Sequence, residues 1–143
     1  MNHFKYSAVA DVLVGSGTSE QLADLAAGLG IQRALIVTDS GIIKFGLLDA
    51  GLEKFKASNI AVKVYSDVVA DPPESVVLEA VKTAQEFGCD GVIGFGGGSS
   101  MDVAKVLAVL IKGEQPLTDI YGVDNITGSR LPLIQIPTTA GTG

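Results

Sequence analysis

Glycine and serine residues are concentrated in one short stretch of the chain, residues 94–105, which reads GFGGGSSMDVAK. Glycine has no Cβ atom and reaches positive φ angles, so a glycine-rich turn lets the backbone come close to a ligand. A helix that begins directly after such a turn adds its first N–H groups and the positive end of its dipole. We therefore expect Gly97, Gly98 and Ser99 to bind the pyrophosphate of a dinucleotide.

The glycine pattern alone is a weak indicator of the ligand. Gly94, Gly96 and Ser99 match the common dinucleotide fingerprint G-x-G-x-x-G, except that serine replaces the third glycine. The stretch is not a Walker A loop, because no Gly-Lys-Ser/Thr follows and Lys105 lies a full turn or more into the expected helix. The alternative is a turn that only joins a strand to a helix. Asp102 also has two interpretations, since the helix dipole stabilises an acid in the first turn without any ligand.

Asp39 is a second candidate for ligand binding, at the end of the apolar run ALIVTDS (34–40). If this strand is a neighbour of the strand before the glycine stretch, the carboxylate points into the same crevice. There it would accept hydrogen bonds from adenosine ribose hydroxyls and repel a 2′-phosphate, so we expect NAD(H) to be preferred over NADP(H). Common dinucleotide folds place this acid after the glycine loop, whereas Asp39 precedes it. The alternative role is to cap the helix that begins near Gly41.

Histidine and cysteine are almost absent from the chain. His3 and Cys89 are the only residues of their types, which excludes a multi-histidine metal site, a Ser-His-Asp triad and a disulfide within this chain. We interpret Cys89 as a small buried core residue. We expect this chain to contribute neither a catalytic residue nor a metal ligand.

The candidate residues lie between elements that alternate regularly along the chain. Apolar, β-branched runs bounded by turn residues predict strands at 34–40, 61–68, 91–97 and 131–139. Helical spacing predicts helices at 19–29, 42–57, 74–87 and 100–111. This alternation predicts an α/β fold, a Rossmann-like doubly wound parallel sheet that forms one domain over residues 1–143. In such a fold, ligands bind beyond the carboxyl ends of the strands.

The helix at 74–87 has the clearest predicted limits. We expect Asp71 to cap it, Pro72 and Pro73 to suit its first turn, and Gly88 to suit its C-terminal exit. The polar connection at 113–130 is long enough to predict a functional loop.

Composition narrows the classes of partner. The chain has 143 residues, 47% of them hydrophobic, and its 10 basic and 16 acidic residues give a net charge of −6. No cluster of Lys and Arg is present, so we expect no nucleic-acid partner. The N-terminus matches neither a secretory signal nor a transit peptide, and no apolar run is long enough to span a membrane. We therefore expect no membrane contact and a cytoplasmic location.

Three motifs together resemble the N-terminal cofactor domain of the iron-containing alcohol dehydrogenase family. They are GGGSSMDVAK at 96–105, DPP at 71–73 and PLIQIPTTAGTG at 132–143. The family's signature includes Gly-Gly-Gly-Ser-x-x-Asp-x-x-Lys and Pro-Thr-Thr-x-Gly-Thr-Gly-Ser-Glu, of which the second stops here before Ser-Glu. The resemblance extends over essentially the whole chain.

The resemblance implies that the glycine loop holds the pyrophosphate of a nicotinamide dinucleotide, with Asp102 close to the nicotinamide end. It also implies that Thr138, Thr139 and Thr142 line the cofactor cleft, where their hydroxyls hydrogen-bond phosphate, ribose or ring substituents. A polar turn at the edge of the core is the alternative for these threonines. Asp71 corresponds to the family's Asn or Asp before proline near the cofactor.

Family members hold a divalent metal, usually iron or zinc, with an aspartate and three histidines in a helical C-terminal domain that is absent from this sequence. An acid at the position of Asp39 resembles the NAD-preferring members. The resemblance therefore implies a fragment, inactive by itself and truncated within its last motif. The parent enzyme would transfer hydride between NAD and an alcohol or aldehyde, with Fe²⁺ or Zn²⁺ as its metal.

Two alternative functions remain open at this point: a free-standing nucleotide-binding or regulatory module, and a fragment of a related enzyme of the glycerol dehydrogenase or dehydroquinate synthase type. We also expect a homo-oligomer. The helix at 100–111 is apolar on nearly every side, so we expect apolar surface around residues 103–111 that self-association would cover.

Overall fold

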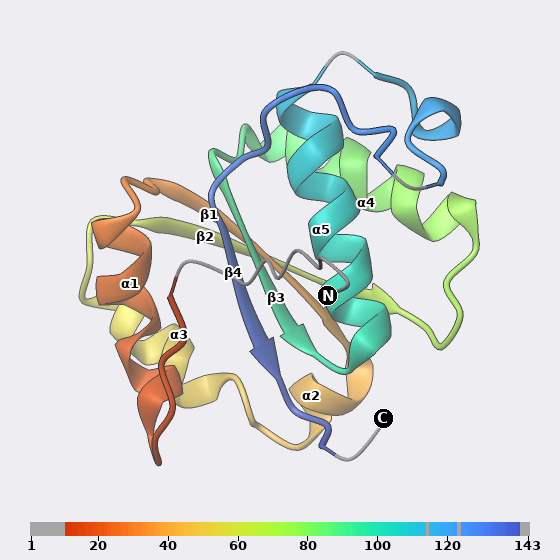
Figure 1. Ribbon diagram of the computed structural model, residues 1–143. Coiled ribbons are helices and arrows are strands. Elements are labelled where there is room, and N and C mark those ends of the chain that lie inside the picture. Colours follow the sequence, from red (N-terminus) through yellow and green to blue (C-terminus); the bar gives the residue numbers. More distant parts are fainter. Residues whose placement is uncertain (1–10, 114, 123, 141–143) are drawn as a thin grey trace, which may run out of the picture.

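The structure is a computed structural model that describes residues 11–113, 115–122 and 124–140 (Figure 1). Its strands are β1 (Arg33–Asp39), β2 (Ala61–Val68), β3 (Gly91–Gly96) and β4 (Leu133–Pro137). Within the described residues these four strands form one parallel sheet in the order β2-β1-β3-β4. The central strand β3 is buried along its whole length, as its continuous apolar sequence predicts, whereas the edge strand β2 alternates between exposed and covered residues.

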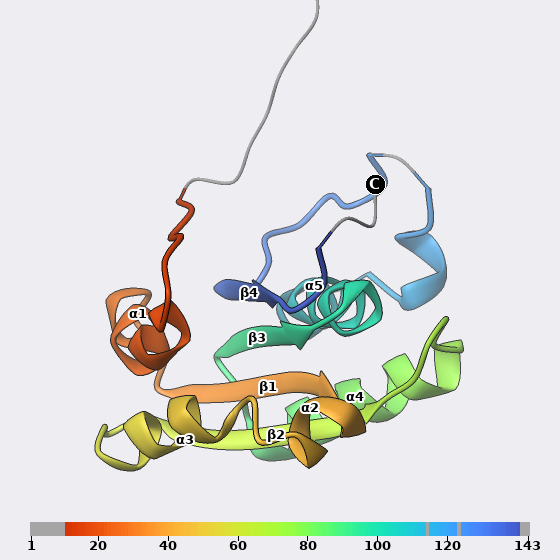
Figure 2. The same ribbon diagram turned by 90° about the horizontal axis from the view of Figure 1, so that it is seen from below.

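Helices cover both faces of the sheet. They are η1 (Thr18–Gln21), α1 (Leu22–Gly28), α2 (Ser40–Lys44), α3 (Asp49–Lys56), α4 (Glu74–Phe87), α5 (Gly98–Lys112) and η2 (Leu117–Asp119). The core therefore has two halves: α4 and α5 pack on the face that carries Leu35 and Val37, and α1 and α3 pack on the face that carries Ala34 and Ile36. Figure 2 shows the two helix pairs on opposite sides of the sheet.

The connections change direction between β1 and β3. From β1 the chain proceeds outward to β2, and from β2 it crosses back to β3 on the other side of β1. The predicted doubly wound α/β fold is thus confirmed. A reversal of this kind opens a crevice at the carboxyl ends of the two inner strands, where such folds bind ligands.

The predicted helix at 42–57 is wrong in one respect, because the structure divides it into α2 and α3. Gly46 lies between them with φ 65°, a left-handed conformation that glycine adopts without a steric cost and that ends α2. Other boundaries also differ from the prediction by one or two residues; for example, α5 begins two residues earlier, at Gly98, and β4 ends two residues earlier, at Pro137.

The predicted limits of α4 are confirmed, but the predicted cap is wrong. Gly88 follows the helix in the left-handed conformation, with φ 67° and ψ 47°. At the other end the N-cap residue is Pro73, and no side chain caps the helix. Asp71 lies two residues before the N-cap, separated from the helix by both prolines, and has φ 47°.

The apolar residues of α5 are covered rather than exposed. Val103 and Leu107 are buried in the core between the sheet and the neighbouring helix, Val109 is buried as well, and Val106, Leu110 and Ile111 are half-buried. This burial contradicts the expectation that residues 103–111 leave an apolar surface. Cys89 is a buried core residue, as predicted, and burial raises the pKa of its thiol.

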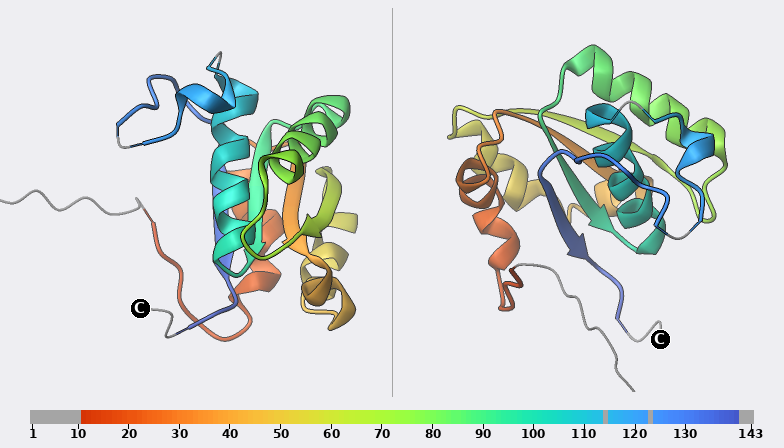
Figure 3. Two further views of the ribbon diagram at one scale, coloured as in Figure 1. Left: turned by 90° about the vertical axis from the view of Figure 1, so that its right-hand side faces the viewer. Right: turned by 45° about the horizontal axis from the view of Figure 1, so that its top comes forward.

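The connection between α5 and β4 contains the short helix η2 (Figure 3). Its middle is tied to the start of α4, where the Tyr121 hydroxyl donates to Glu74 Oε1 at 2.8 Å. The Gln115 side chain bridges the turn, donating to the Asn125 carbonyl and accepting from the Thr127 amide. None of the helices in the described part of the chain is long and apolar enough to cross a membrane.

Candidate dinucleotide site

The glycine loop lies beside Asp39 at the carboxyl ends of β3 and β1. These strands are paired in parallel, so both end at the same edge of the sheet. A Cβ atom added to Gly96 would lie 3.1 Å from Asp39 Oδ2 and 2.8 Å from Ser100 Oγ. Gly96 also has φ 149°, so the close approach and the backbone conformation both require glycine at this position.

The first turn of α5 faces open space. Its N-cap is Gly97, no side chain caps it, and no acid lies in the first turn. The first amides of an α-helix have no acceptor within the helix, so those of Gly98 and Ser99 are available to a ligand. A Cβ added to Gly98 would meet no atom within 4 Å. Because Cα–Cβ bonds in a helix tilt toward its N-terminus, that open space is on the side where these amides point.

Asp39 caps α2 through one of its carboxylate oxygens. Oδ1 accepts hydrogen bonds from the amides of Gly41 at 2.9 Å and Ile42 at 3.1 Å. The alternative of a helix cap is therefore confirmed for Asp39. The second oxygen, Oδ2, takes no part in this cap and is the one that lies toward Gly96.

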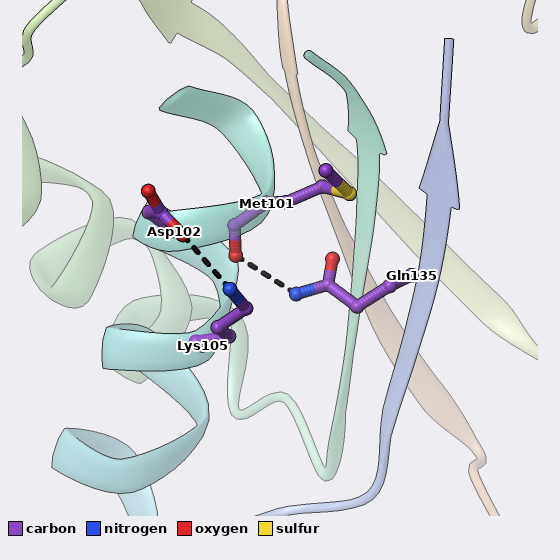
Figure 4. Close-up of polar contacts among 4 residues, drawn as sticks. All are labelled: Met101, Asp102, Lys105 and Gln135. Atoms are coloured by element: carbon purple, nitrogen blue, oxygen red, sulfur yellow. Dashed lines mark hydrogen bonds and ion pairs between the residues drawn. The ribbon is translucent and has the colours of Figure 1, made fainter. Parts of the chain in front are cut away.

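Asp102 lies in the second turn of α5, because the helix begins at Gly98. The interpretation of Asp102 as a first-turn acid is therefore wrong. Its carboxylate is exposed and pairs with Lys105, with 2.9 Å between Oδ1 and Nζ (Figure 4). The pair lies on α5 one turn beyond the glycine loop.

Thr138 and Thr139 follow β4 next to the glycine loop. The Thr138 amide donates to the Gly96 carbonyl at 2.9 Å, and Thr139 Cγ2 lies 3.5 Å from the position of a Cβ on Gly97. Both threonines are exposed. Thr142 lies outside the described residues.

Asp71 is the predicted site residue that the structure separates from the others. It follows β2, and β1 lies between β2 and the strand that leads into the glycine loop. Its side chain is exposed. Asp71 therefore lies at the same edge of the sheet as the glycine loop without contacting it.

Gln135 is a residue at this site that sequence reasoning missed. From β4 its Nε2 donates to the Met101 carbonyl of α5 at 2.8 Å (Figure 4). Its Oε1 is buried and has no hydrogen-bond partner among the described residues. A glutamine inside the apolar run PLIQIP was the available signal, but its partner α5 is 34 positions away in the sequence.

Two depressions among the described residues lie away from the candidate site, one lined by Gly30, Gln32 and Asn59, the other by Leu52 and Val64 among others. The described residues also contain no group of three or more His, Cys, Asp or Glu side chains that could hold a metal ion. The site is an open face with backbone donors, an acid and hydroxyls, a donor set that suits a dinucleotide.

Comparisons with known proteins agree with this geometry. Residues 10–143 match the family model of iron-containing alcohol dehydrogenases. Over 136 residues the chain is 40% identical to long-chain-alcohol dehydrogenase 1 of Geobacillus thermodenitrificans, covering 91% of this chain and 34% of that protein.

Solved structures give the same result. The NADH-dependent butanol dehydrogenase A of Thermotoga maritima matches with a TM-score of 0.87 and 28% identity, over 99% of this chain and 36% of that one. Sulfoacetaldehyde reductase of Bifidobacterium kashiwanohense, solved in complex with NAD⁺, matches with a TM-score of 0.76 and 29% identity, over 90% of this chain and 34% of that one. The chain thus spans about a third of the length of these proteins. Together with the family match, these likenesses show that the chain belongs to the iron-containing alcohol dehydrogenase family.

Proposed function

We propose that this chain is the dinucleotide-binding part of an NAD-dependent alcohol dehydrogenase. The observation that carries the proposal is the uncapped first turn of α5, which faces open space over Gly98. This turn lies beside Asp39 at the point where the sheet reverses its winding, the position at which doubly wound folds bind nucleotides. Membership of the family supports the same ligand.

The amides of Gly97, Gly98 and Ser99 would hold the pyrophosphate, because they combine free N–H donors with the positive end of the α5 dipole. Asp39 Oδ2 would accept hydrogen bonds from the adenosine ribose, and its charge would disfavour a 2′-phosphate. When bound, the dinucleotide supplies the nicotinamide ring that takes up or releases hydride.

The remaining predicted residues extend the site to either side of the loop. We infer that Thr138, Thr139 and Thr142 donate hydroxyl hydrogen bonds to the cofactor, supported by the position of Thr139 Cγ2 on the side of Gly97 where a Cβ would lie. Asp102 would lie near the nicotinamide end, with its charge partly balanced by Lys105. Asp71 would approach the cofactor from the end of β2.

The rest of the proposal concerns the whole enzyme. Fe²⁺ or Zn²⁺ would be held by residues outside this chain and would polarise the substrate oxygen. The substrate is an alcohol or aldehyde; the proteins that this chain resembles are described as acting on substrates from long-chain alcohols to sulfoacetaldehyde. We also propose that the whole enzyme is a homo-oligomer in the cytoplasm.

Isothermal titration of the chain with NAD⁺ and NADP⁺ tests this function. We expect NAD⁺ to bind more tightly than NADP⁺, and AMP and nicotinamide alone to bind much more weakly, because neither carries the pyrophosphate. The absence of NAD⁺ binding would overturn the proposal. If NAD⁺ bound no more tightly than AMP, the proposed binding of the pyrophosphate by the glycine loop would be wrong.

A further inference from the structure

We propose that Gln135 is a positioning residue: it fixes the first turn of α5 against β4, so that the glycine-loop amides stay aimed at one point. The inference rests on the proposed function for the identity of the ligand. The hydrogen bond between β4 and α5 on which the inference depends exists whatever the ligand is.

Strand β4 and the residue that follows it hold the glycine loop at two places, one on each side of the available amides. Before them, the Thr138 backbone amide donates to the Gly96 carbonyl at 2.9 Å. After them, Gln135 Nε2 donates to the Met101 carbonyl at 2.8 Å (Figure 4). The segment between Gly96 and Met101 is thus tied to the sheet at both ends. Donors that must converge on an anion gain from such restraint, because less motion is lost on binding.

The neighbouring residues make room for the glutamine. A Cβ atom on Gly94 would overlap Gln135 Oε1 and lie 2.9 Å from the Cβ of Ala104. The absence of a side chain at this point of β3 is therefore what allows the amide group to lie between β3 and α5. The position of the Gln135 amide therefore explains why the motif has glycine at residue 94, which lies before the expected pyrophosphate site.

The glutamine is an unfavourable choice for stability alone. Its buried Oε1 has no partner among the described residues, and an unpaired buried acceptor costs free energy that an apolar side chain of the same length would avoid. The interaction that favours glutamine at this position is the hydrogen bond that its Nε2 donates to the Met101 carbonyl. The positioning role therefore predicts that binding and stability respond in opposite directions when the amide is removed.

The experiment uses Gln135→Met, which keeps the length of the side chain and removes both the donor and the unpaired oxygen. We expect the unfolding midpoint to stay equal or rise. We expect amide hydrogen exchange at Met101, whose N–H bonds to the Gly97 carbonyl at 3.1 Å, to accelerate. We expect NAD⁺ affinity to fall about three- to tenfold, the range for one hydrogen bond.

A second variant tests the same role from the other side of the contact. Gly94→Ala keeps Gln135 but places a Cβ in the space of its amide and 2.9 Å from the Cβ of Ala104 in α5, so exchange should accelerate and affinity fall at least as much as in Gln135→Met. The matched control is Gln85→Met on the exposed face of α4, which should change neither quantity.

The outcomes separate the inference from the proposed function. A wild-type chain that does not bind NAD⁺ overturns the function, while the exchange rate at Met101 still decides the inference. Wild-type exchange in both Gln135→Met and Gly94→Ala overturns the inference. A lower unfolding midpoint of Gln135→Met with unchanged NAD⁺ affinity also overturns it, because Gln135 would then serve packing only.

Discussion

The amino and carboxyl edges of the sheet differ in how their polar groups are paired. At the amino edge, where β1 and β3 begin, Asp90 Oδ1 accepts from the backbone amides of Gln32 at 3.0 Å and Arg33 at 2.8 Å. Arg33 in turn donates to the Phe87 carbonyl at the end of α4, and its guanidinium lies 4.5 Å from the centre of the Phe87 ring. The polar groups that join β1, β3 and α4 at this edge are thus paired with one another.

At the carboxyl edge several groups lack such partners. The first turn of α5 has no side-chain cap, Gly98 faces open space, and Asp71 has a left-handed backbone. Free amides at an exposed helix end bind water or a ligand, and strained backbone clusters at functional sites. The comparison teaches that substitutions at the amino edge should change folding, whereas substitutions at the carboxyl edge should change binding.

The largest effect is expected at Gly98. In Gly98→Val a branched side chain fills the space over the first amides of α5, so NAD⁺ affinity should fall about a hundredfold or more, roughly 2.7 kcal/mol. Stability should change by less than about 1 kcal/mol, because the position is helical and free of contacts. Calorimetric titration and thermal unfolding measure the two quantities.

The control for this substitution is Gly128→Val, since Gly128 also has open space around it but lies in the connection before β4. It should bind NAD⁺ like the wild type. Wild-type affinity in Gly98→Val would show that the glycine loop does not hold the ligand.

The next largest effect is expected at Asp90 on the amino edge. Removal of its carboxylate in Asp90→Ala leaves the amides of Gln32 and Arg33 without an acceptor, so the free energy of unfolding should fall by about 2 kcal/mol. Asp90→Asn keeps one acceptor oxygen and should lose less. Urea denaturation gives the stability, and NAD⁺ affinity should stay within about twofold of wild type, well under 1 kcal/mol. A large loss of affinity in the folded Asp90→Ala chain would break the division between the edges.

Asp39 belongs to both sides of the comparison, and two variants separate its roles. Asp39→Gly removes the cap of α2 and the charge, whereas Asp39→Asn keeps a capping oxygen and removes only the charge. Both should shift the ratio of NAD⁺ to NADP⁺ affinity toward NADP⁺ by about tenfold, or 1.4 kcal/mol. Only the glycine variant should also lose stability, by a few tenths to about 1 kcal/mol. An unchanged ratio in both variants would leave Asp39 as a cap only.

Sequence alone predicted the sheet and its winding, because continuous apolar runs such as the one in β3 are typical of buried parallel strands. The same reasoning missed the break between α2 and α3. Apolar residues continue at helical spacing across Gly46, and nothing local indicates that this glycine takes a positive φ rather than a helical one.

The candidate site was predictable to the extent that it is local. The glycine loop and the end of β1 are each visible as short motifs, and strand pairing brings them together. The capping role of Asp71 failed because a cap must lie next to the first turn, and the two prolines displace it. Gln135 was missed because its contact with Met101 depends on packing between distant segments, which composition and spacing do not reveal.

The smallest effect is expected at Asp71. A left-handed backbone costs aspartate some free energy that glycine does not pay, so Asp71→Gly should raise the unfolding free energy by a few tenths to about 1 kcal/mol. If the carboxylate approaches the cofactor, the same variant should bind NAD⁺ about two- to fivefold more weakly, as for the loss of one hydrogen bond.

Asp71→Asn distinguishes these contributions, because asparagine tolerates the left-handed conformation and keeps an acceptor oxygen. Its affinity should lie between those of the wild type and the glycine variant, with stability close to wild type. A gain in stability of Asp71→Gly without any loss of affinity would assign the strained backbone to the turn before α4. A substitution of Asp71 would then change folding and not binding, as we expect for residues at the amino edge, although Asp71 lies at the carboxyl edge.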